Sequence, residues 1–232
     1  FMFGPEADGL LLPKPPAEML AKGDFATGVP VIIGSNTDEA SFFTASRDIP
    51  TAEAYRENLE KDAKIIAQSF GIEIDVEKTL SLYPVQDYPT PKGAYNALVR
   101  DLAFTCPSRV AARAIAAAQP NTFLYIFGKP ADERGLLSDW GAFHGSELAF
   151  VFGNFEFMGI KFATKNNSIL SKKMMAYWTS FARDGKPHAD GLLAWNPFDP
   201  AKNNYLYLDM EIKEGANYQA AQCDYLETIL FR

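Results

Sequence analysis

The chain contains the stretch Val29-Pro-Val-Ile-Ile-Gly-Ser-Asn-Thr-Asp-Glu-Ala-Ser-Phe-Phe43, in which an apolar run leads into a polar turn. The β-branched and apolar residues from Val29 to Ile33 are typical of a buried parallel strand. The turn ends on an acidic residue, Glu39, and the aromatic pair Phe42 and Phe43 lies a few residues further on. The stretch therefore predicts a sheet strand that leads into a turn bearing a carboxylate.

Strand and helix patterns alternate along the rest of the chain. Further strands are predicted over 122–127 and 205–208, and helices over 17–22, from 51 to a stop at Gly71, 76–82, 168–183 and 219–231. The segment 94–118 fits one long helix or two helices broken at Pro107. This alternation predicts an α/β architecture, a mostly parallel sheet with flanking helices. Because two or three strands leave open edges, we expect the rest of the sheet to lie on sequence outside these 232 residues.

Composition limits the class of protein. With 232 residues and 47% hydrophobic content, the chain can bury a large core, as one domain or as part of a larger one. A formal net charge of -7 without a basic stripe argues against a nucleic-acid partner. Apolar runs fall far short of the ~20 residues that span a bilayer, so no transmembrane segment is expected. Residues 1–10 read like the interior of a sequence, so they do not indicate a compartment.

A second informative stretch runs from Trp140 to Gly153 and reads WGAFHGSELAFVFG. It sets His144, one of only two histidines, in a turn flanked by glycines and aromatic residues. Glu39 and His144 supply an acid and a base, but serine hydrolases also need a nucleophile on a G-x-S-x-G turn. This sequence contains no such motif. Taken alone, His144 also fits a histidine packed in an aromatic loop, and Glu39 a carboxylate stabilised by a helix dipole.

Several blocks of the sequence, taken in order, carry a resemblance to a known family. They are Phe3-Gly-Pro-Glu-Ala-Asp-Gly9, the stretch 30–43, Asp101-Leu-Ala-Phe-Thr-Cys-Pro107, the stretch 140–153, Tyr177-Trp-Thr-Ser-Phe-Ala182 and Trp195. Together they resemble the C-terminal half of the type-B carboxylesterase family, which includes bacterial and fungal esterases, lipases and cholinesterases. The resemblance implies that residues 1–232 are the C-terminal part of a single α/β-hydrolase domain. It also implies that the serine turn and the oxyanion loop lie upstream, so that this chain lacks the serine.

The resemblance also implies roles for individual residues. Glu39 matches the acid of the catalytic triad and His144 matches the base. Phe42 and Phe43 match positions that line the acyl or alcohol pocket, although paired aromatic residues also occur as plain core.

The two cysteines, Cys106 and Cys223, are too few for a disulfide framework and lack the paired spacing of a zinc site, so no metal is expected. They match a pair that is bridged in secreted relatives, and a reduced, buried pair is the alternative. A bridge would favour a secreted or extracytoplasmic location, which the sequence otherwise leaves unknown.

Three further titratable residues, Asp38, Glu147 and His188, have weaker indications of a role. Asp38, beside the acid, fits a solvated or turn-capping carboxylate. Glu147 fits either hydrogen bonds that hold the histidine loop or a structural salt bridge. His188 lies in a polar, turn-rich loop, where an exposed histidine without a role is expected.

The function that the resemblance implies is serine carboxylesterase activity on small-molecule esters, through an acyl-enzyme and without a metal or organic cofactor. The partner of this chain is then the missing N-terminal half of the same domain. One alternative is a cholinesterase-like adhesion or binding domain that has lost catalysis. Another is an epoxide- or peptide-cleaving hydrolase with the same fold.

Overall fold

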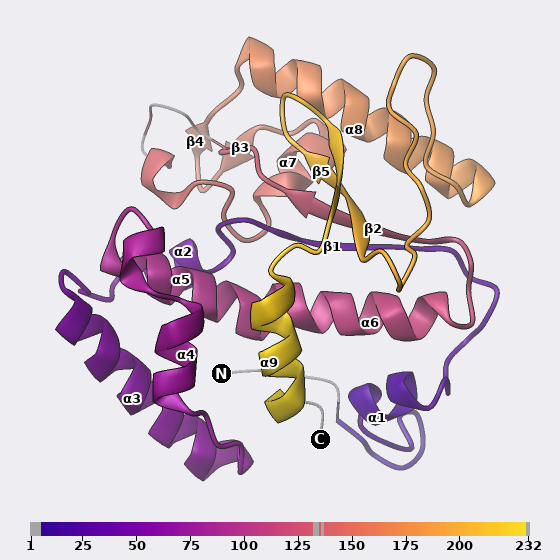
Figure 1. The fold of residues 1–232 in the computed structure, drawn as a ribbon. Coiled ribbons are helices and arrows are strands. Elements are labelled where there is room, and N and C mark those ends of the chain that lie inside the picture. Colours follow the sequence, from indigo (N-terminus) through magenta and orange to yellow (C-terminus); the bar gives the residue numbers. More distant parts are fainter. Residues whose placement is uncertain (1–5, 132–134, 136, 231–232) are drawn as a thin grey trace.

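A four-stranded sheet organises the molecule (Figure 1). The computed structural model describes residues 6–131, 135 and 137–230. The strand order is β1-β2-β5-β6, in which β1, β2 and β5 are parallel and β6 is antiparallel to β5. Their bounds are Val31–Asn36, Thr122–Phe127, Asn204–Leu208 and Lys213–Ala216. The mostly parallel sheet confirms the predicted α/β class. Within the described residues β1 pairs only with β2, so its other edge is open.

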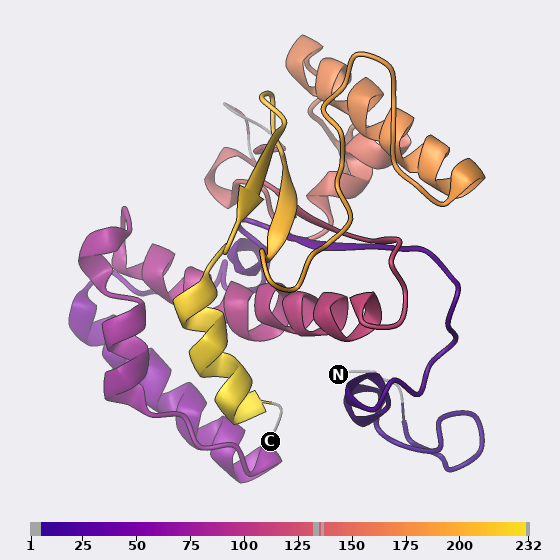
Figure 2. The same cartoon turned by 45° about the vertical axis from the view of Figure 1, so that its right-hand side comes forward.

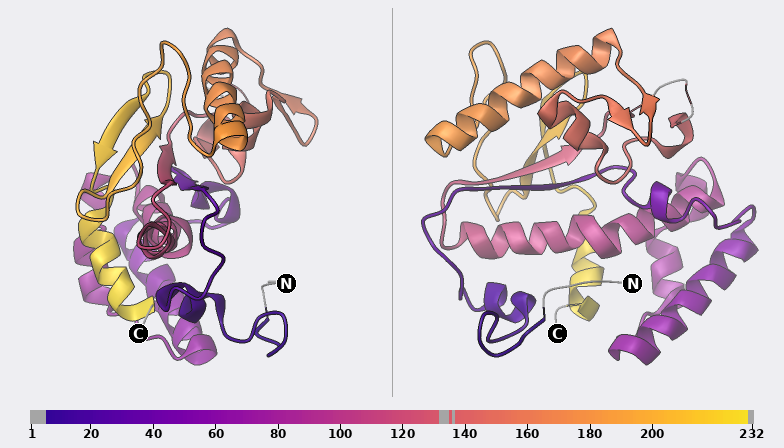
Figure 3. Two further views of the ribbon diagram at one scale, coloured as in Figure 1. Left: turned by 90° about the vertical axis from the view of Figure 1, so that its right-hand side faces the viewer. Right: turned by 180° about the vertical axis from the view of Figure 1, so that it is seen from behind.

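The helices are α1 (Pro16–Ala21), α2 (Ala40–Phe43), α3 (Ala52–Phe70), α4 (Val76–Leu82), α5 (Pro91–Arg100), α6 (Cys106–Ala116), α7 (Ser146–Phe152), α8 (Lys165–Asp184) and α9 (Ala220–Leu230). Short 3-10 turns occupy Val85–Asp87 and Ser138–Trp140. Figures 2 and 3 show α7 and α8 on one side of the sheet and α6 on the other. The helices therefore flank the sheet on both faces, as a buried parallel sheet requires.

Successive side chains of β2 point to opposite faces of the sheet and so contribute to two separate parts of the core. Phe123 and Phe127 pack with Leu170, Met174 and Tyr177 of α8. Leu124 points to the opposite face, where it packs with Ala112 of α6 and with Phe198. This division follows from the strand period of two. A separate group of aromatic and aliphatic side chains holds α3, α4 and α5 together.

Capping residues mark both ends of two helices, although α8 begins at Lys165, three residues before its predicted start at residue 168. The Thr51 side chain accepts a hydrogen bond from the Ala54 N–H at the start of α3, which ends at Gly71 with φ +68°. In α8 the Thr164 side chain accepts from the Asn167 N–H, and Gly185 ends the helix with φ +71°. A positive φ costs little at glycine, so both glycines are effective stops.

The structure corrects the predicted bounds of two segments. The first strand begins at Val31 rather than Val29 and continues to Asn36, because Val29 is 59% exposed and Pro30 has no N–H to donate. The 94–118 segment is continuously helical from Pro91 to Ala116, which agrees with the alternative of one long helix rather than two helices broken at Pro107. A π-helical turn, Asp101–Thr105, joins α5 to α6 within it. Pro107 lies in the first turn of α6, where its missing N–H breaks no helical hydrogen bond.

Some elements have no counterpart in the sequence-based prediction. These are β6, the hairpin of β3 (Glu156–Phe157) and β4 (Ile160–Lys161), and the short helix α7. The predicted end of the last helix at Phe231 and the first residues of the 3–9 block lie outside the described residues. So does part of the segment 129–138, whose polar sequence after the 122–127 strand predicts a loop. No helix in the described part of the chain is both long and apolar enough for a membrane crossing.

Candidate active site

Glu39 and His144 both follow parallel strands at their carboxyl ends. Glu39 comes three residues after β1 and directly precedes α2. His144 follows β2 by a longer connection and lies just before α7. Because neighbouring parallel strands end at the same edge of the sheet, the two side chains meet there, which is the usual position of ligand sites in open α/β sheets.

The two side chains form a hydrogen-bonded pair. His144 Nδ1 lies 2.7 Å from Glu39 Oε2, and Glu39 Oε1 accepts a hydrogen bond of 2.8 Å from the Asn36 N–H. The Glu39 side chain is 6% exposed, whereas that of His144 is 48% exposed. An ionised carboxylate only accepts hydrogen bonds, so Nδ1 carries the hydrogen and Nε2 of the neutral imidazole is an acceptor. The arrangement therefore provides a half-exposed base whose tautomer is set by a buried acid.

Burial has the largest effect on the pKa of Glu39 and raises it. The Asn36 N–H and His144 act in the opposite direction, since both stabilise the ionised form, and the Glu147 carboxylate adds to the increase. The net result is a raised pKa for this carboxyl group.

The turn that carries Glu39 also holds the loop in front of His144. The Asp38 N–H donates to the Ala142 carbonyl at 3.2 Å, and the Ala142 N–H donates back to Asp38 Oδ2 at 3.0 Å. Ser41 Oγ donates to the Trp140 carbonyl at 2.6 Å. Asp38 is thus not simply a solvated or turn-capping group, because its carboxylate accepts from the histidine loop.

Asn36 and Glu147 form further hydrogen bonds around the same loop. Asn36 Nδ2 donates to the Phe143 carbonyl at 2.8 Å and to Glu147 Oε2 at 2.5 Å. Of the two roles weighed for Glu147, this contact corresponds to a hydrogen bond that holds the histidine loop.

Aromatic rings surround the imidazole. The Phe43 ring centroid is 5.1 Å from that of His144, and the Phe104 centroid is 4.9 Å from it. Phe43 and Phe104 stack on each other at 5.9 Å, while Phe42 packs edge-on against Trp140 at 5.4 Å. Phe42 and Phe43 are 39% and 51% exposed, respectively, so they are not plain core. Sequence reasoning missed Phe104, although it lies in the 101–107 block that carries the resemblance.

A cavity of about 500 Å³ lies behind the turn that bears Glu39. Its lining includes Asp38, Ser41, Asn96, Arg100 and Trp140, but neither Glu39 nor His144. The exposed rings of Phe42 and Phe43 and the imidazole of His144 therefore lie outside this cavity.

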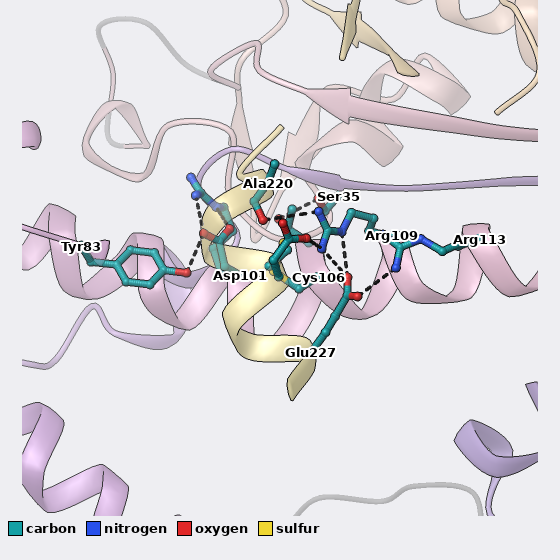
Figure 4. The surroundings of a disulfide bond; sticks show 12 residues. Ser35, Tyr83, Asp101, Cys106, Arg109, Arg113, Ala220 and Glu227 are labelled. Carbon is teal, nitrogen blue, oxygen red and sulfur yellow. Dashed lines mark hydrogen bonds and ion pairs between the residues drawn. A yellow bond between two sulfur atoms is a disulfide. The ribbon is translucent and has the colours of Figure 1, made fainter. Parts of the chain in front are cut away.

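Cys106 and Cys223, the pair that the resemblance joins, form a disulfide that ties α6 to α9. Figure 4 shows the charged groups around it. Arg109, whose side chain is 5% exposed, donates to Glu227 and to Asp224 of α9, and Arg113 also donates to Glu227. On the other side, buried Asp101 accepts hydrogen bonds from Arg100 and Tyr83. Covalent and ionic contacts therefore fix α9 against the rest of the chain.

The other groups considered from the sequence lie apart from this pair. His188 is 59% exposed, and its Nε2 lies 2.7 Å from Asp184 Oδ2 at the end of α8. Among the described residues, no three His, Cys, Asp or Glu side chains come close enough together to bind a metal ion.

Comparison with solved structures identifies the class of fold. A structure of PNB esterase superposes with a TM-score of 0.74 at 27% identity, covering 97% of this chain and 43% of that one. EstA from Aspergillus niger superposes with a TM-score of 0.78 at 21% identity, covering 97% of this chain and 44% of that one. The fold is that of the α/β-hydrolases.

The family follows from sequence comparison. The model of the carboxylesterase family matches residues 1–226, and this chain belongs to that family. Carboxylesterase 1D of Rattus norvegicus is 34% identical over 93% of the chain, and acylcarnitine hydrolase of the same species is 34% identical over 88%. Cocaine esterase of Homo sapiens is 30% identical over 96% of the chain. The chain spans between 37% and 41% of the length of these relatives.

Proposed function

We propose that this chain supplies the acid and the base of a Ser-Glu-His triad in a carboxylic ester hydrolase. The observation that supports this most directly is the 2.7 Å contact between Glu39 Oε2 and His144 Nδ1. It occurs at the carboxyl ends of parallel strands in a member of the carboxylesterase family. Glu39 is the acid, His144 is the base, and Phe42 and Phe43 line the substrate pocket.

The chemistry follows from the properties of these groups. A serine hydroxyl is too weakly acidic to attack an ester, so His144 Nε2 accepts its proton and later delivers it to the leaving alcohol. The imidazolium formed in between is stabilised by the carboxylate of Glu39, which itself stays ionised. Water then attacks the acyl-enzyme with His144 again as the base. Neither step requires a metal ion or an organic cofactor.

The remaining parts of the site are proposed to lie upstream. We propose that residues 1–232 form the C-terminal part of a single α/β-hydrolase domain, whose N-terminal part carries the serine and the oxyanion N–H groups. The open edge of β1 supports this, since its unpaired backbone groups could pair with a further strand from the N-terminal part. The substrate class is carboxylic esters of small molecules.

Ester hydrolysis by the full-length protein tests the proposal. A short p-nitrophenyl ester is offered to the wild type, His144→Ala and His188→Ala. His188 is the matched control, because it is the other histidine and pairs with Asp184 outside the site. We expect His144→Ala to lose about 10³-fold or more in kcat and His188→Ala to retain the wild-type rate.

Two results would contradict the proposal. One is equal turnover by the wild type and His144→Ala, or no turnover by either, which would favour a non-catalytic binding domain. The other is a full-length sequence without a G-x-S-x-G turn upstream of residue 1.

A further inference from the structure

The acid and the base lie on two segments that are far apart in sequence. Glu39 is 105 residues from His144, and their side chains share one hydrogen bond. The imidazole is about half exposed, so packing alone does not fix its position. The distance between the two side chains therefore depends on what holds the backbone of residues 140–143 against the turn after β1.

Asp38 supplies two of the hydrogen bonds in that attachment, beside one each from Asn36 and Ser41. Its N–H and its carboxylate both bind Ala142, at 3.2 Å to the carbonyl and 3.0 Å from the N–H. The same oxygen, Oδ2, accepts from the Thr37 hydroxyl at 2.8 Å, which fixes the carboxylate on its own turn. Two hydrogen bonds therefore join Asp38 to Ala142, which lies two positions before His144.

The Asp38 carboxylate also packs closely against the backbone of the neighbouring Gly141. Gly141 has φ +60°, and a Cβ placed on it would lie 2.5 Å from Asp38 Oδ2 and 2.7 Å from Asp38 Cγ. The carboxylate thus occupies the space that any other side chain at position 141 would need. Since the backbone conformation also favours glycine, Asp38 and Gly141 fit together as a packed pair.

We infer that Asp38 is a positioning residue, whose carboxylate oxygen holds the histidine loop so that His144 Nδ1 stays within hydrogen-bond distance of Glu39. This inference rests on the proposed function. The required feature is a hydrogen-bond acceptor at the Oδ2 position, not a negative charge. A loop displaced by about 1 Å would break the pairing of acid and base, and errors of that size cost about 10²-fold in rate.

Three variants of the full-length protein separate the roles of acceptor and charge. Asp38→Ala removes both. Asp38→Asn removes the charge but keeps an oxygen that can accept from the Ala142 N–H and the Thr37 hydroxyl. Asp139→Ala removes an exposed carboxylate from the same loop and is the control. We expect kcat to fall about 10- to 100-fold in Asp38→Ala with KM little changed, and to stay near wild type in the other two.

A second readout does not depend on turnover. The sequence has only two histidines, so the His144 Nδ1–H proton can be assigned by NMR in histidine-labelled protein, with His188→Ala to identify the other signal. We expect a downfield Nδ1–H signal in the wild type and Asp38→Asn, and its loss in Asp38→Ala. If Asp38→Ala does not fold, Ser41→Ala, which frees the Trp140 carbonyl on the same loop, is expected to weaken the signal.

The outcomes separate the inference from the proposed function. If the wild type hydrolyses no ester, the proposed function fails and the NMR signal alone decides the role of Asp38. An unchanged signal and rate in Asp38→Ala would overturn the inference. An equal loss in Asp38→Asn and Asp38→Ala would also overturn it, because the charge and not the acceptor would then be required.

Discussion

At the scale of single residues, the proposed role of Glu39 as the acid requires an ionised carboxylate, although burial raises the pKa of this group. Replacing it with glutamine removes the charge and places an amide N–H group beside His144 Nδ1. The amide can donate to this nitrogen and would hold the imidazole in the tautomer that presents Nε2–H, which cannot accept a proton. We expect Glu39→Gln to lower kcat by about 10³- to 10⁴-fold. A variant that keeps more than a tenth of the wild-type kcat would argue against Glu39 as the acid.

The raised pKa of Glu39 also predicts how stability depends on pH. A carboxyl group whose pKa is higher in the folded state than its ordinary value of 4.5 binds its proton more tightly when folded. Its contribution to stability is therefore complete below pH 4.5 and is lost as the pH rises through the folded pKa. As the pH rises from acid to neutral, the free energy of unfolding of the wild type should therefore fall relative to that of Glu39→Gln. Urea unfolding of both proteins across this range measures the difference, and a constant difference would contradict the raised pKa.

Gly34 in β1 is a residue whose small size the sheet requires. It pairs with Tyr125, and an added Cβ would lie 2.5 Å from the tyrosine ring and from its carbonyl oxygen. We expect Gly34→Ala to reduce the free energy of unfolding by about 1–3 kcal/mol. Gly93→Ala in α5 is the matched control, because its Cβ would meet Thr90 at an ordinary 3.4 Å and alanine favours helix. Denaturant midpoints of both variants give the comparison, and similar losses in both would contradict the steric argument.

At the scale of elements, the sequence predicts best where capping residues and apolar patterns agree. Thr51 and Gly71 bracket α3, and the 122–127 prediction matches β2. The π-helical turn 101–105 between α5 and α6 was not predicted, because it contains neither glycine nor proline and does not interrupt the helix. The strand β6 was missed because its residues are mostly exposed and polar, as befits the edge of a sheet.

The candidate site likewise contains residues that the sequence identifies and contacts that it does not. Glu39 and His144 lie in blocks that the family resemblance identifies, so they could be named from the sequence. Phe104 and the attachment of Asp38 to Ala142 could not, because each depends on contacts between segments that are distant in the chain.

The disulfide that ties helix α9 to α6 allows its contribution to the free energy of unfolding to be measured. The Cys106–Cys223 bridge joins residues 117 positions apart, so it restricts a long loop of the unfolded chain. Replacing both cysteines with alanine should reduce the free energy of unfolding by roughly 4–5 kcal/mol in the chain-entropy model. A thiol assay in denaturant should detect no thiol in the wild type before reduction and two afterwards. Two thiols without reduction would contradict the bridge.

At the scale of the whole molecule, this chain exposes apolar side chains and a strand edge that the proposed N-terminal part of the domain would cover. The outer edge of β1 is unpaired within the described residues, and Phe43, Leu148 and Phe152 are at least half exposed. We expect the isolated chain to aggregate or to bind a hydrophobic dye. Dye fluorescence and size-exclusion chromatography of residues 1–232 measure this, and a sharp two-state melt of a monomer that binds no dye would contradict it.

The bridge between α6 and α9 also encloses most of the sheet and His144 within one covalent ring. A protease that cuts the backbone once, anywhere between residues 106 and 223, would open this ring without releasing a fragment. The two pieces would migrate as one molecule until a reductant separates them. After a single cut in this range, Glu39 and His144 therefore remain in one covalently linked molecule.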